Sequence, residues 1–503
     1  MAQIDRYSDV LHLALLLRHG DEKAARSVLR RAGVDLNRTN DDKETLLHLI
    51  CKVNDGLRVL YDFFEISEIQ TLADHNSKLA SLLLSKGDKP NLSDFEGTTL
   101  LHVICKRSFG DDLAELFFKI NDELNLTVLI DAQDKSGSTP LHLALASHNW
   151  KLVNLLLKRG ADLNRTNDKA ETPLHLICEI TEDLQILYDF FEISKENDRT
   201  IEVDAQDIFG DRPLHWALRH GNRTAAELLL RRGADPNLAS SYGVTPLHLI
   251  CQGKVDDDFA ELFFRINDEL NQTVQVDAKD NQGQTPLQWA VACVLPNAVD
   301  LLLDRGAGLF SFAYPDESHF GTSYVPLNSE LWHNSRLRLA SGALMIAQRL
   351  EQRGYELKDS DYQQIIALFV KHQMFEKLVD LEEPWYEDKE FARRSRMIMV
   401  NADRSLRDLI RMGPDEASSQ LTYRNYYELG CSAEYHGLPE RVRDACDLHL
   451  CEKLSRPFFL HSEQRAFSKL PLDQRIGLKG RRKRILKRLN NEQLCKLFLS
   501  VAC

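Results

Sequence analysis

The chain has 503 residues, 43% of them hydrophobic and 28% charged, and its formal net charge at pH 7 is −13. This composition is typical of a folded globular protein, and the negative charge argues against a protein that coats nucleic acid along its whole length. No stretch approaches about 18 consecutive apolar residues, and the N-terminus has no basic region or long apolar core, so we expect no membrane span and no secretory signal. At about 150 residues per domain, the length predicts roughly three domains or one elongated array.

A short motif recurs along the first two-thirds of the chain. It reads Leu-His, then Leu, Val or Trp, then Ala or Ile, and its successive spacings are 36, 54, 40, 33, 40, 33 and 40 residues. A period near 33 residues indicates a solenoid of helical repeats. The repeated position is held by His12, His48, His102, His142, His175, His215 and His248, and by Gln288 in the eighth place.

The sequence around each motif predicts a pair of helices. Thr-Pro precedes Leu-His, as at Thr139 and Pro140, which places an N-cap oxygen and then a proline at the first helical position, where an N–H would have no partner. A second apolar helix follows about fifteen residues later and ends at a glycine, such as Gly160 or Gly233, that can adopt the left-handed conformation closing a helix. Asp-x-x-Gly turns, as at 134–137, separate the units.

These features resemble the ankyrin repeat. Its Gly-x-Thr-Pro-Leu-His-x-Ala stretch stands at Gly137 to Ala144, and Gly-Ala-Asp-x-Asn closes the same unit at Gly160 to Asn164. The resemblance covers roughly residues 8–308 and implies about eight units, each a β-turn and two antiparallel helices, stacked in a curved array. The spacing of 54 between His48 and His102 predicts an irregular second unit over residues 52–92.

Long and short units alternate, and a pair of them makes a block of 73 residues. In the long units the motif ends in cysteine, and in four units a phenylalanine pair takes the place of the Leu-Leu of the second helix. We expect both kinds of side chain in a reduced, packed core, which indicates an intracellular protein. These residues are Cys51, Cys105, Cys178 and Cys251, and the pairs Phe63-Phe64, Phe117-Phe118, Phe190-Phe191 and Phe263-Phe264.

From about residue 310 the repeat stops. We expect a linker or capping loop over 309–328, a helical domain over 329–455 and a distinct C-terminal segment over 456–503. The predicted helices of this region are 331–350, one capped by Ser360 and Asp361, and segments around 393–412, 418–431 and 440–454. The predicted fold class is therefore all-α, an ankyrin-repeat solenoid followed by a C-terminal α-helical domain that packs on the end of the array or continues it.

The segment 456–503 resembles the C-terminal module of the PRANC family, which is known from poxviruses and from parasitoid insects and their symbionts and is similar to a truncated F-box. The resemblance rests on Leu-Pro, Ile-Leu-x-x-Leu and a leucine pair in that order. It departs from the F-box in the interval from Pro471 to Ile485. This interval is about twice as long as the corresponding interval in an F-box, and it includes a basic run, 479–484. The resemblance implies docking to the Skp-type linker of a cullin–RING ubiquitin ligase through Leu470, Pro471, Ile485, Leu486, Leu489, Leu494 and Leu497.

The sequence contains no signature of a catalytic or cofactor site, and we expect neither an enzyme nor a cofactor. The repeat histidines stand one per unit, so we interpret them as structural side chains that hydrogen-bond the neighbouring turn. One alternative is a zinc site, because zinc accepts thiolates and imidazoles, although the spacing places the last three candidates in one helix. The candidate ligands are Cys431, His436, Cys446, His449 and Cys451.

The leading functional hypothesis is a non-catalytic adaptor that tethers a client protein to a ubiquitin ligase. Exposed apolar residues at the turn tips are the candidate client contacts, namely Phe95, Ile208, Phe209 and Tyr242. The alternative is an ankyrin scaffold or inhibitor that sequesters a signalling or transcription factor. We expect no membrane partner, no nucleic-acid partner and a cytoplasmic location, with the nucleus as the alternative if the basic run is an import signal.

Overall fold

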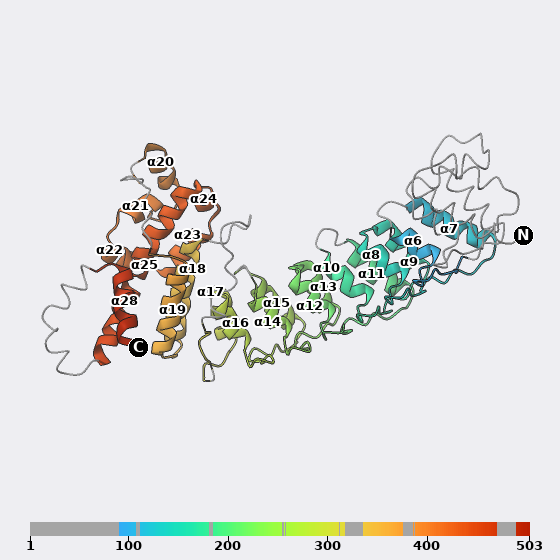
Figure 1. Ribbon diagram of the computed structural model, residues 1–503, viewed down its shortest axis with the longest axis horizontal. Coiled ribbons are helices and arrows are strands. Elements are labelled where there is room, and N and C mark those ends of the chain that lie inside the picture. The colour runs from blue at the N-terminus through green and yellow to red at the C-terminus, as the bar shows by residue number, and fades with distance from the viewer. Residues whose placement is uncertain are drawn as a thin grey trace, which may run out of the picture. The chain divides into compact units, whose positions relative to one another are not determined.

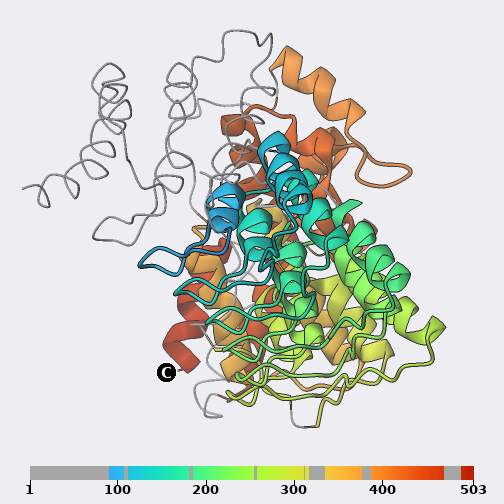
Figure 2. The ribbon, with the colours of Figure 1, turned by 90° about the vertical axis from the view of Figure 1, so that its right-hand side faces the viewer.

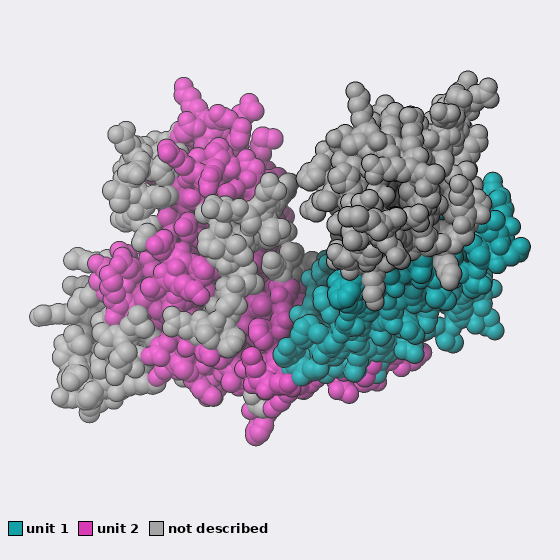
Figure 3. Space-filling view, turned by 45° about the vertical axis from the view of Figure 1, so that its right-hand side comes forward, with its two compact units in different colours: residues 1–235, 239–242 teal, residues 236–238, 243–503 magenta. Residues whose placement is uncertain are grey.

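A computed structural model describes the chain in two compact units, which are coloured separately in Figure 3. Unit 1 covers residues up to 235 together with 239–242, and unit 2 covers 236–238 and 243–503. The described residues are mostly helical and, apart from two isolated β-bridges, contain no strand, which confirms the all-α prediction. The structure describes residues 90–106, 111–180, 185–253, 256, 258–310, 312–316, 335–375, 386, 388–469 and 489–502.

The described helices of unit 1 come in pairs (Figure 1). The first helices are α6 (Leu100–Cys105), α8 (Pro140–Ala146), α10 (Pro173–Glu179) and α12 (Pro213–Arg219). The second helices are α7 (Asp111–Glu123), α9 (Trp150–Lys158), α11 (Gln185–Glu196) and α13 (Arg223–Arg231). First helices pack on first helices along the array, and α9 packs on both α7 and α11, so neighbouring units share one core.

Local chemistry fixes the ends of these helices as the sequence predicts. Thr139 caps α8 and Pro140 is its first residue, while the Asn149 side chain accepts a hydrogen bond from the Leu152 amide at the start of α9. Gly160 and Gly233 follow second helices with φ of +100° and +97°, a left-handed conformation that favours glycine. The first two predicted units, including the irregular one, lie almost entirely outside the described residues.

Unit 2 begins with two more helix pairs and continues with the C-terminal helices. The pairs are α14 (Pro246–Cys251) with α15 (Phe259–Glu269), and α16 (Pro286–Ala292) with α17 (Pro296–Asp304). The helices that follow are α18 (Arg336–Gln352), α19 (Asp359–Lys371), α20 (Lys389–Met397), α21 (Leu406–Arg411), α22 (Pro414–Gln420), α23 (Tyr423–Cys431), α24 (Ala433–His436), α25 (Glu440–Lys469) and α28 (Asn491–Ala502). No described helix is both long and apolar enough to cross a membrane.

Within unit 2, the C-terminal helices pack directly against the last helix pair. Helix α18 lies between α17 on one side and α23 and α25 on the other. Arg349 and Arg424 pair with Asp300 of α17 at 3.3 and 3.7 Å, and Arg353 pairs with Asp304. A half-buried carboxylate adds to this junction, because Asp256 accepts hydrogen bonds from the amides of Asn297 and Ala298 and from the Tyr427 hydroxyl.

Several predicted C-terminal helices differ from the observed ones. Helix α19 is capped at Lys358, whose amide donates to Asp361 at 2.8 Å, so Ser360 and Asp361 belong to the first turn instead of preceding it. The segments 393–412 and 418–431 are each two helices, interrupted at 398–405 and at 421–422. Helix α25 continues through Pro457 to Lys469, so the expected boundary between residues 455 and 456 falls inside a helix.

Candidate protein interface

Side-chain hydrogen bonds close the described turns of unit 1, with an aspartate as the acceptor in three of them, Asn167 in another and Ser240 in the turn that carries Tyr242. Asp134 Oδ1 accepts hydrogen bonds from the amides of Ser136 and Ser138 at 2.9 and 3.0 Å. Asp207 Oδ1 binds the amides of Phe209 and Asp211 in the same way, at 2.8 and 2.9 Å. Such turns hold the side chains at their tips in a fixed orientation toward solvent.

Backbone hydrogen bonds also join one turn to the next. The Lys135 amide donates to the Glu96 carbonyl at 2.8 Å, and the Ile208 amide donates to the Lys169 carbonyl at 3.0 Å. The Ser241 amide donates to the Phe209 carbonyl at 2.9 Å. The turn tips of unit 1 therefore form one connected edge instead of independent loops.

The candidate client residues are exposed on this edge. The exposed fractions of Phe95, Ile208, Phe209 and Tyr242 are 55, 56, 49 and 56%. Ile208, Phe209 and Tyr242 occupy two consecutive turns. We call these three side chains the second tip patch. Phe95 forms the first tip patch with Lys135, whose Nζ lies 3.8 Å from the Phe95 ring centroid. Sequence reasoning missed Lys135, although it occupies the turn of the next unit beside Phe95.

The repeat histidines that the structure describes are buried, as expected for structural side chains, whereas His12 and His48 lie outside the described residues. His142 Nδ1 accepts hydrogen bonds from the Thr139 amide and hydroxyl at 3.2 and 2.8 Å, and its Nε2 donates to the Glu171 carbonyl at 3.0 Å. A carbonyl can only accept, so this ring is neutral with its proton on Nε2. Burial lowers the pKa of the four histidines that make this set of contacts, which are His102, His142, His175 and His248.

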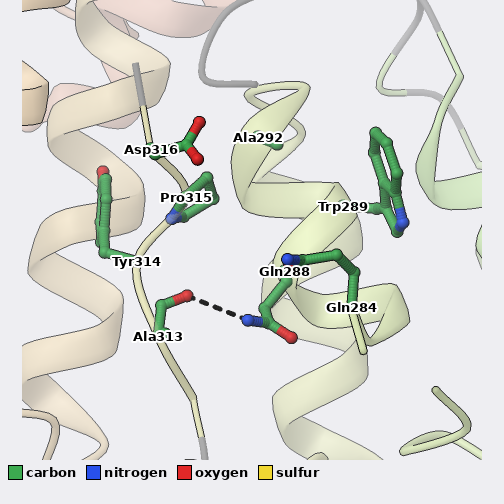
Figure 4. Close-up of a pocket in the computed structure, with 8 residues that line it drawn as sticks. All are labelled: Gln284, Gln288, Trp289, Ala292, Ala313, Tyr314, Pro315 and Asp316. Atoms are coloured by element: carbon green, nitrogen blue, oxygen red, sulfur yellow. Dashed lines mark hydrogen bonds between the residues drawn. The ribbon is translucent and has the colours of Figure 1, made fainter. Parts of the chain in front are cut away.

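Gln288 reproduces the same contacts in the eighth unit. Its Oε1 accepts from the Thr285 amide at 2.9 Å and its Nε2 donates to the Ala313 carbonyl at 3.2 Å. A small pocket of about 210 Å³ lies beside it (Figure 4), lined by Gln284, Gln288, Trp289, Ala292, Ala313, Tyr314, Pro315 and Asp316. This lining pairs no nucleophile with a general base, so we assign it no catalytic role.

The proposed zinc ligands are not brought together. His436 Nε2 bonds the Gly430 carbonyl at 2.9 Å, and His449 Nε2 bonds the Ile410 carbonyl at 3.1 Å. Cys446 and Cys451 are buried in α25, and burial raises the pKa of both thiols well above the usual range. Within the described ranges, no three His, Cys, Asp or Glu side chains are grouped to hold a metal ion.

The structure covers the ligase-docking candidates only in part. Leu489 is half-buried, and Leu494 is fully buried where α28 packs on α25. Leu497 lies in α28, but its side chain is not among those described. The candidates Leu470, Pro471, Ile485 and Leu486, and the basic run 479–484, lie outside the described residues.

Helix α28 is fixed to α25 by polar contacts as well as by apolar packing. The Asn491 side chain donates to the Glu452 carbonyl at 2.7 Å and to the Ser455 hydroxyl at 2.9 Å. Leu494 is therefore part of a helix–helix core, and it would reach a partner only if α28 moved away from α25.

Comparison with known proteins identifies the repeats. A family model for ankyrin repeats in three copies matches residues 69–167 and 152–240. Human transient receptor potential cation channel subfamily A member 1 is 28% identical over 197 residues, 38% of this chain and 17% of that protein. Mouse inversin is 28% identical over 240 residues, 47% of this chain and 21% of that protein.

Other similar proteins cover less of the chain or are more distant. Alpha-latrotoxin-Lhe1a from Latrodectus hesperus is 34% identical over 132 residues, 25% of this chain and 8% of the toxin. The crystal structure of the ankyrin repeat domain of Bcl-3 aligns with 47% of this chain and 92% of its own, at 23% identity and a TM-score of 0.35. The match to this chain spans 17% of the length of the channel and 21% of the length of inversin. The family model shows that the chain contains ankyrin repeats.

Proposed function

We propose that this chain is a non-catalytic adaptor that binds a client protein through the turn tips of its ankyrin repeats. The observation that carries the proposal is the exposure of large apolar side chains on a rigid, hydrogen-bonded edge. Side chains already held in place lose little conformational entropy on binding, and buried aromatic anchors supply most of the affinity of protein interfaces. The second tip patch, with three such side chains on two adjacent turns, is the centre of the proposed contact.

The test compares proteins captured by the natural chain, by an Ile208→Ser/Tyr242→Ser variant and by a Leu129→Ser control. Leu129 is 55% exposed in unit 1 but lies outside the turn tips. We expect at least one protein to bind the natural chain and the control directly and to lose about tenfold or more in affinity for the variant. If every direct partner binds all three chains equally, the tips are not the client site.

We also propose that the chain recruits a cullin–RING ubiquitin ligase through the segment 456–503. This recruitment is supported by the resemblance of this segment to a truncated F-box. Removing the whole segment is a poor test, because α25 runs through its first residues and α28 packs on α25. Such a truncation would remove α28, expose the side of α25 on which Leu494 packs, and destabilise the helical domain.

An Ile485→Glu/Leu486→Glu variant tests recruitment with the full chain. If the segment docks a Skp-type linker, the natural chain co-purifies with Skp and cullin, and the variant loses both while it unfolds at the same temperature. If neither chain co-purifies with Skp, recruitment is ruled out and only the client-binding role stands.

The second candidate function is an ankyrin scaffold or inhibitor that sequesters a signalling or transcription factor. The burial of Leu494 between α28 and α25 favours this function, because it gives the end of the chain a structural role. Under it, the Ile485→Glu/Leu486→Glu variant would inhibit its client as well as the natural chain does, and client abundance would not change. We place either activity in the cytoplasm or the nucleus.

A further inference from the structure

A second exposed surface, on helix α20 and the turn after it, is separate from the turn tips. Met397 and Met399 are 74 and 52% exposed, while Ile398 and Val400 between and after them are buried. This alternation shows that the chain leaves α20 in an extended conformation. The methionine side chains face solvent, and the side chains of Ile398 and Val400 face the interior. Figures 1 and 2 show α20 at the outer end of the C-terminal helices.

Exposed arginines of α20 precede the two methionines. Arg393, Arg396 and Met397 are spaced three and four residues apart, so they share one face of α20, opposite the buried Phe391 and Ser395. Arg404, next to Ser405 of the bridge, is half-buried and donates to Gln420 Oε1 at 3.0 Å. We call Arg393, Arg396, Met397, Met399 and Arg404 the α20 surface. It is a basic, apolar patch on a chain whose formal net charge is −13.

The extended segment also has an open backbone edge. The Val400 amide donates to the Arg404 carbonyl, and the Leu406 amide donates to the Ile398 carbonyl, both at 2.8 Å. These bonds flank the antiparallel bridge between Met399 and Ser405. The amide and carbonyl of Met399 therefore point away from Ser405. Neither group hydrogen-bonds another residue in the part of the chain that the structure describes.

We propose that the α20 surface binds an extended acidic segment of a partner protein, whose backbone pairs with Met399 and whose carboxylates contact the arginines. An exposed edge recruits an added strand through main-chain hydrogen bonds, and the flanking side chains then select its sequence. Methionine side chains adapt to varied apolar partners, and arginine binds carboxylates through two parallel hydrogen bonds. This interaction goes beyond client binding at the turn tips.

A peptide fits this surface better than a lipid membrane or a nucleic acid. The open amide and carbonyl of Met399 match a peptide backbone, whereas a bilayer or a nucleic acid offers no complementary strand. Glu390 and Asp408 also lie among the arginines: Glu390 pairs with Arg394 at 2.8 Å, and Asp408 accepts hydrogen bonds from Ser405. Both carboxylates reduce the positive charge of this surface for any anionic partner, so backbone pairing at Met399 is what favours the peptide.

The test uses a fluorescent peptide of about eight residues that alternates glutamate with valine or leucine, a length typical of one strand. Its binding to the full chain is measured by fluorescence anisotropy, alongside an Arg393→Glu/Arg396→Glu variant and a Met397→Ser/Met399→Ser variant. A Lys158→Glu/Lys195→Glu variant is the control, because it makes the same change of charge at exposed positions of α9 and α11.

We expect the arginine variant to lose about tenfold or more in affinity and the methionine variant to lose a smaller factor, while the control binds like the natural chain. A second peptide, N-methylated at alternate amides, keeps its charges but cannot pair along an edge. It should bind the unaltered chain at least about fivefold more weakly, a comparison that does not depend on any variant folding.

Three results would overturn the proposal. One is the absence of binding between the natural chain and the acidic peptide. Another is an equal loss in the arginine variant and the control, which would indicate general attraction between charges. The last is tighter binding to phosphatidylserine vesicles or to single-stranded RNA than to the peptide, which would assign the surface to a different class of partner.

Discussion

At the residue scale, a histidine in four of the described repeats links two neighbouring repeats through one ring, and these are His102, His142, His175 and His248. Its place in the sequence predicts this role, because a single histidine per unit cannot converge with others into a site. His142 shows why a histidine recurs at this position of the repeat. Its ring accepts a hydrogen bond from Thr139 in its own repeat and donates one to the Glu171 carbonyl in the next repeat. The bond at Nδ1 requires the neutral ring, so protonation would break the contact with Thr139, whereas Nε2 could still donate to Glu171.

These contacts make the array sensitive to acid. The pKa of His142 and of His175 is lower in the folded chain than in the unfolded chain, chiefly because of burial and despite nearby carboxylates. The stability they supply is therefore present above the unfolded pKa of about 6.5 and is lost as the pH falls through the lower folded value. We expect the free energy of unfolding to fall below pH 6.5, by up to about 1.4 kcal/mol per pH unit for each proton taken up.

Replacing the histidines with glutamine tests this account. Gln288 makes the equivalent two contacts, with Thr285 and with the Ala313 carbonyl. A His142→Gln/His175→Gln variant should therefore lose only about 1 to 2 kcal/mol in free energy of unfolding at pH 7.5. Urea unfolding at pH 7.5 and pH 5.5 should show a smaller loss of stability on acidification in the variant than in the natural chain. An equal loss in both chains would mean that other groups cause the acid sensitivity.

At the element scale, an arginine after a second helix joins it to the second helix of the preceding unit. In unit 1, the Arg159 guanidinium lies 4.6 Å from the Phe118 ring centroid and 2.8 Å from Asp122 Oδ2. Arg232 makes the same contact with Phe191. In unit 2, Arg305 makes it with Phe264, so the contact repeats with the 73-residue block of the sequence.

Substitution of Arg159 measures this contact. Arg159→Ala should lower the free energy of unfolding by about 1 kcal/mol, because it removes a partly exposed cation–π contact together with an ion pair. Arg159→Lys should recover only part of the loss, since an ammonium keeps the charge but not the planar stacking. Urea unfolding of the three chains checks the order, and equal stabilities would show that the contact contributes nothing.

Elements set by local chemistry were predictable, and elements set by distant contacts were not. The capped helix pairs and the buried phenylalanine pairs follow from short motifs such as Thr139-Pro140. The interruption of the expected helix at 398–405 has local signals that sequence reasoning missed, because Asn401 Oδ1 accepts from the amides of Asp403 and Arg404 and Ser405 caps α21. By contrast, α25 continues through Pro457 because packing against neighbouring helices outweighs the lost hydrogen bond, whereas proline usually ends a helix.

The same distinction applies to the candidate surfaces. The exposure of Phe95, Ile208, Phe209 and Tyr242 agrees with the turn positions inferred from the repeat. The α20 surface was not predicted, because the pattern around Met397 and Met399 is compatible with a continuous amphipathic helix. Only the extended geometry after α20 places both methionines in solvent beside Arg393 and Arg396.

At the scale of the whole molecule, unit 2 joins the last ankyrin helices and the C-terminal helices in one packed body. Gly342 of α18 marks a close approach between them, because a Cβ there would lie 2.8 Å from Val294 Cγ1 and 3.2 Å from the Tyr427 ring. Val294 precedes α17, and Tyr427 belongs to α23. The glycine therefore allows α18 to fit between the repeats and the C-terminal helices.

A single methyl group at this position should weaken unit 2. Gly342→Ala gains up to about 1 kcal/mol of helix propensity but creates overlaps that cost about 1 to 3 kcal/mol, so we expect a net loss of stability. Gly437→Ala is the control, since Gly437 has a φ of −69° and the added methyl group would meet its nearest neighbours at 3.5 Å, an ordinary contact. Calorimetry should show a lower unfolding temperature for Gly342→Ala alone, and an unchanged temperature would contradict the close packing.

The central claim is that the second tip patch binds the client, and the affinity of one purified client for paired variants tests it most directly. Dissociation constants are measured for the natural chain, for Ile208→Ser/Tyr242→Ser and for Leu129→Ser. The account predicts about a tenfold or greater loss for the tip variant and an unchanged constant for the control. Equal affinity of all three chains, with all three folded, would contradict it.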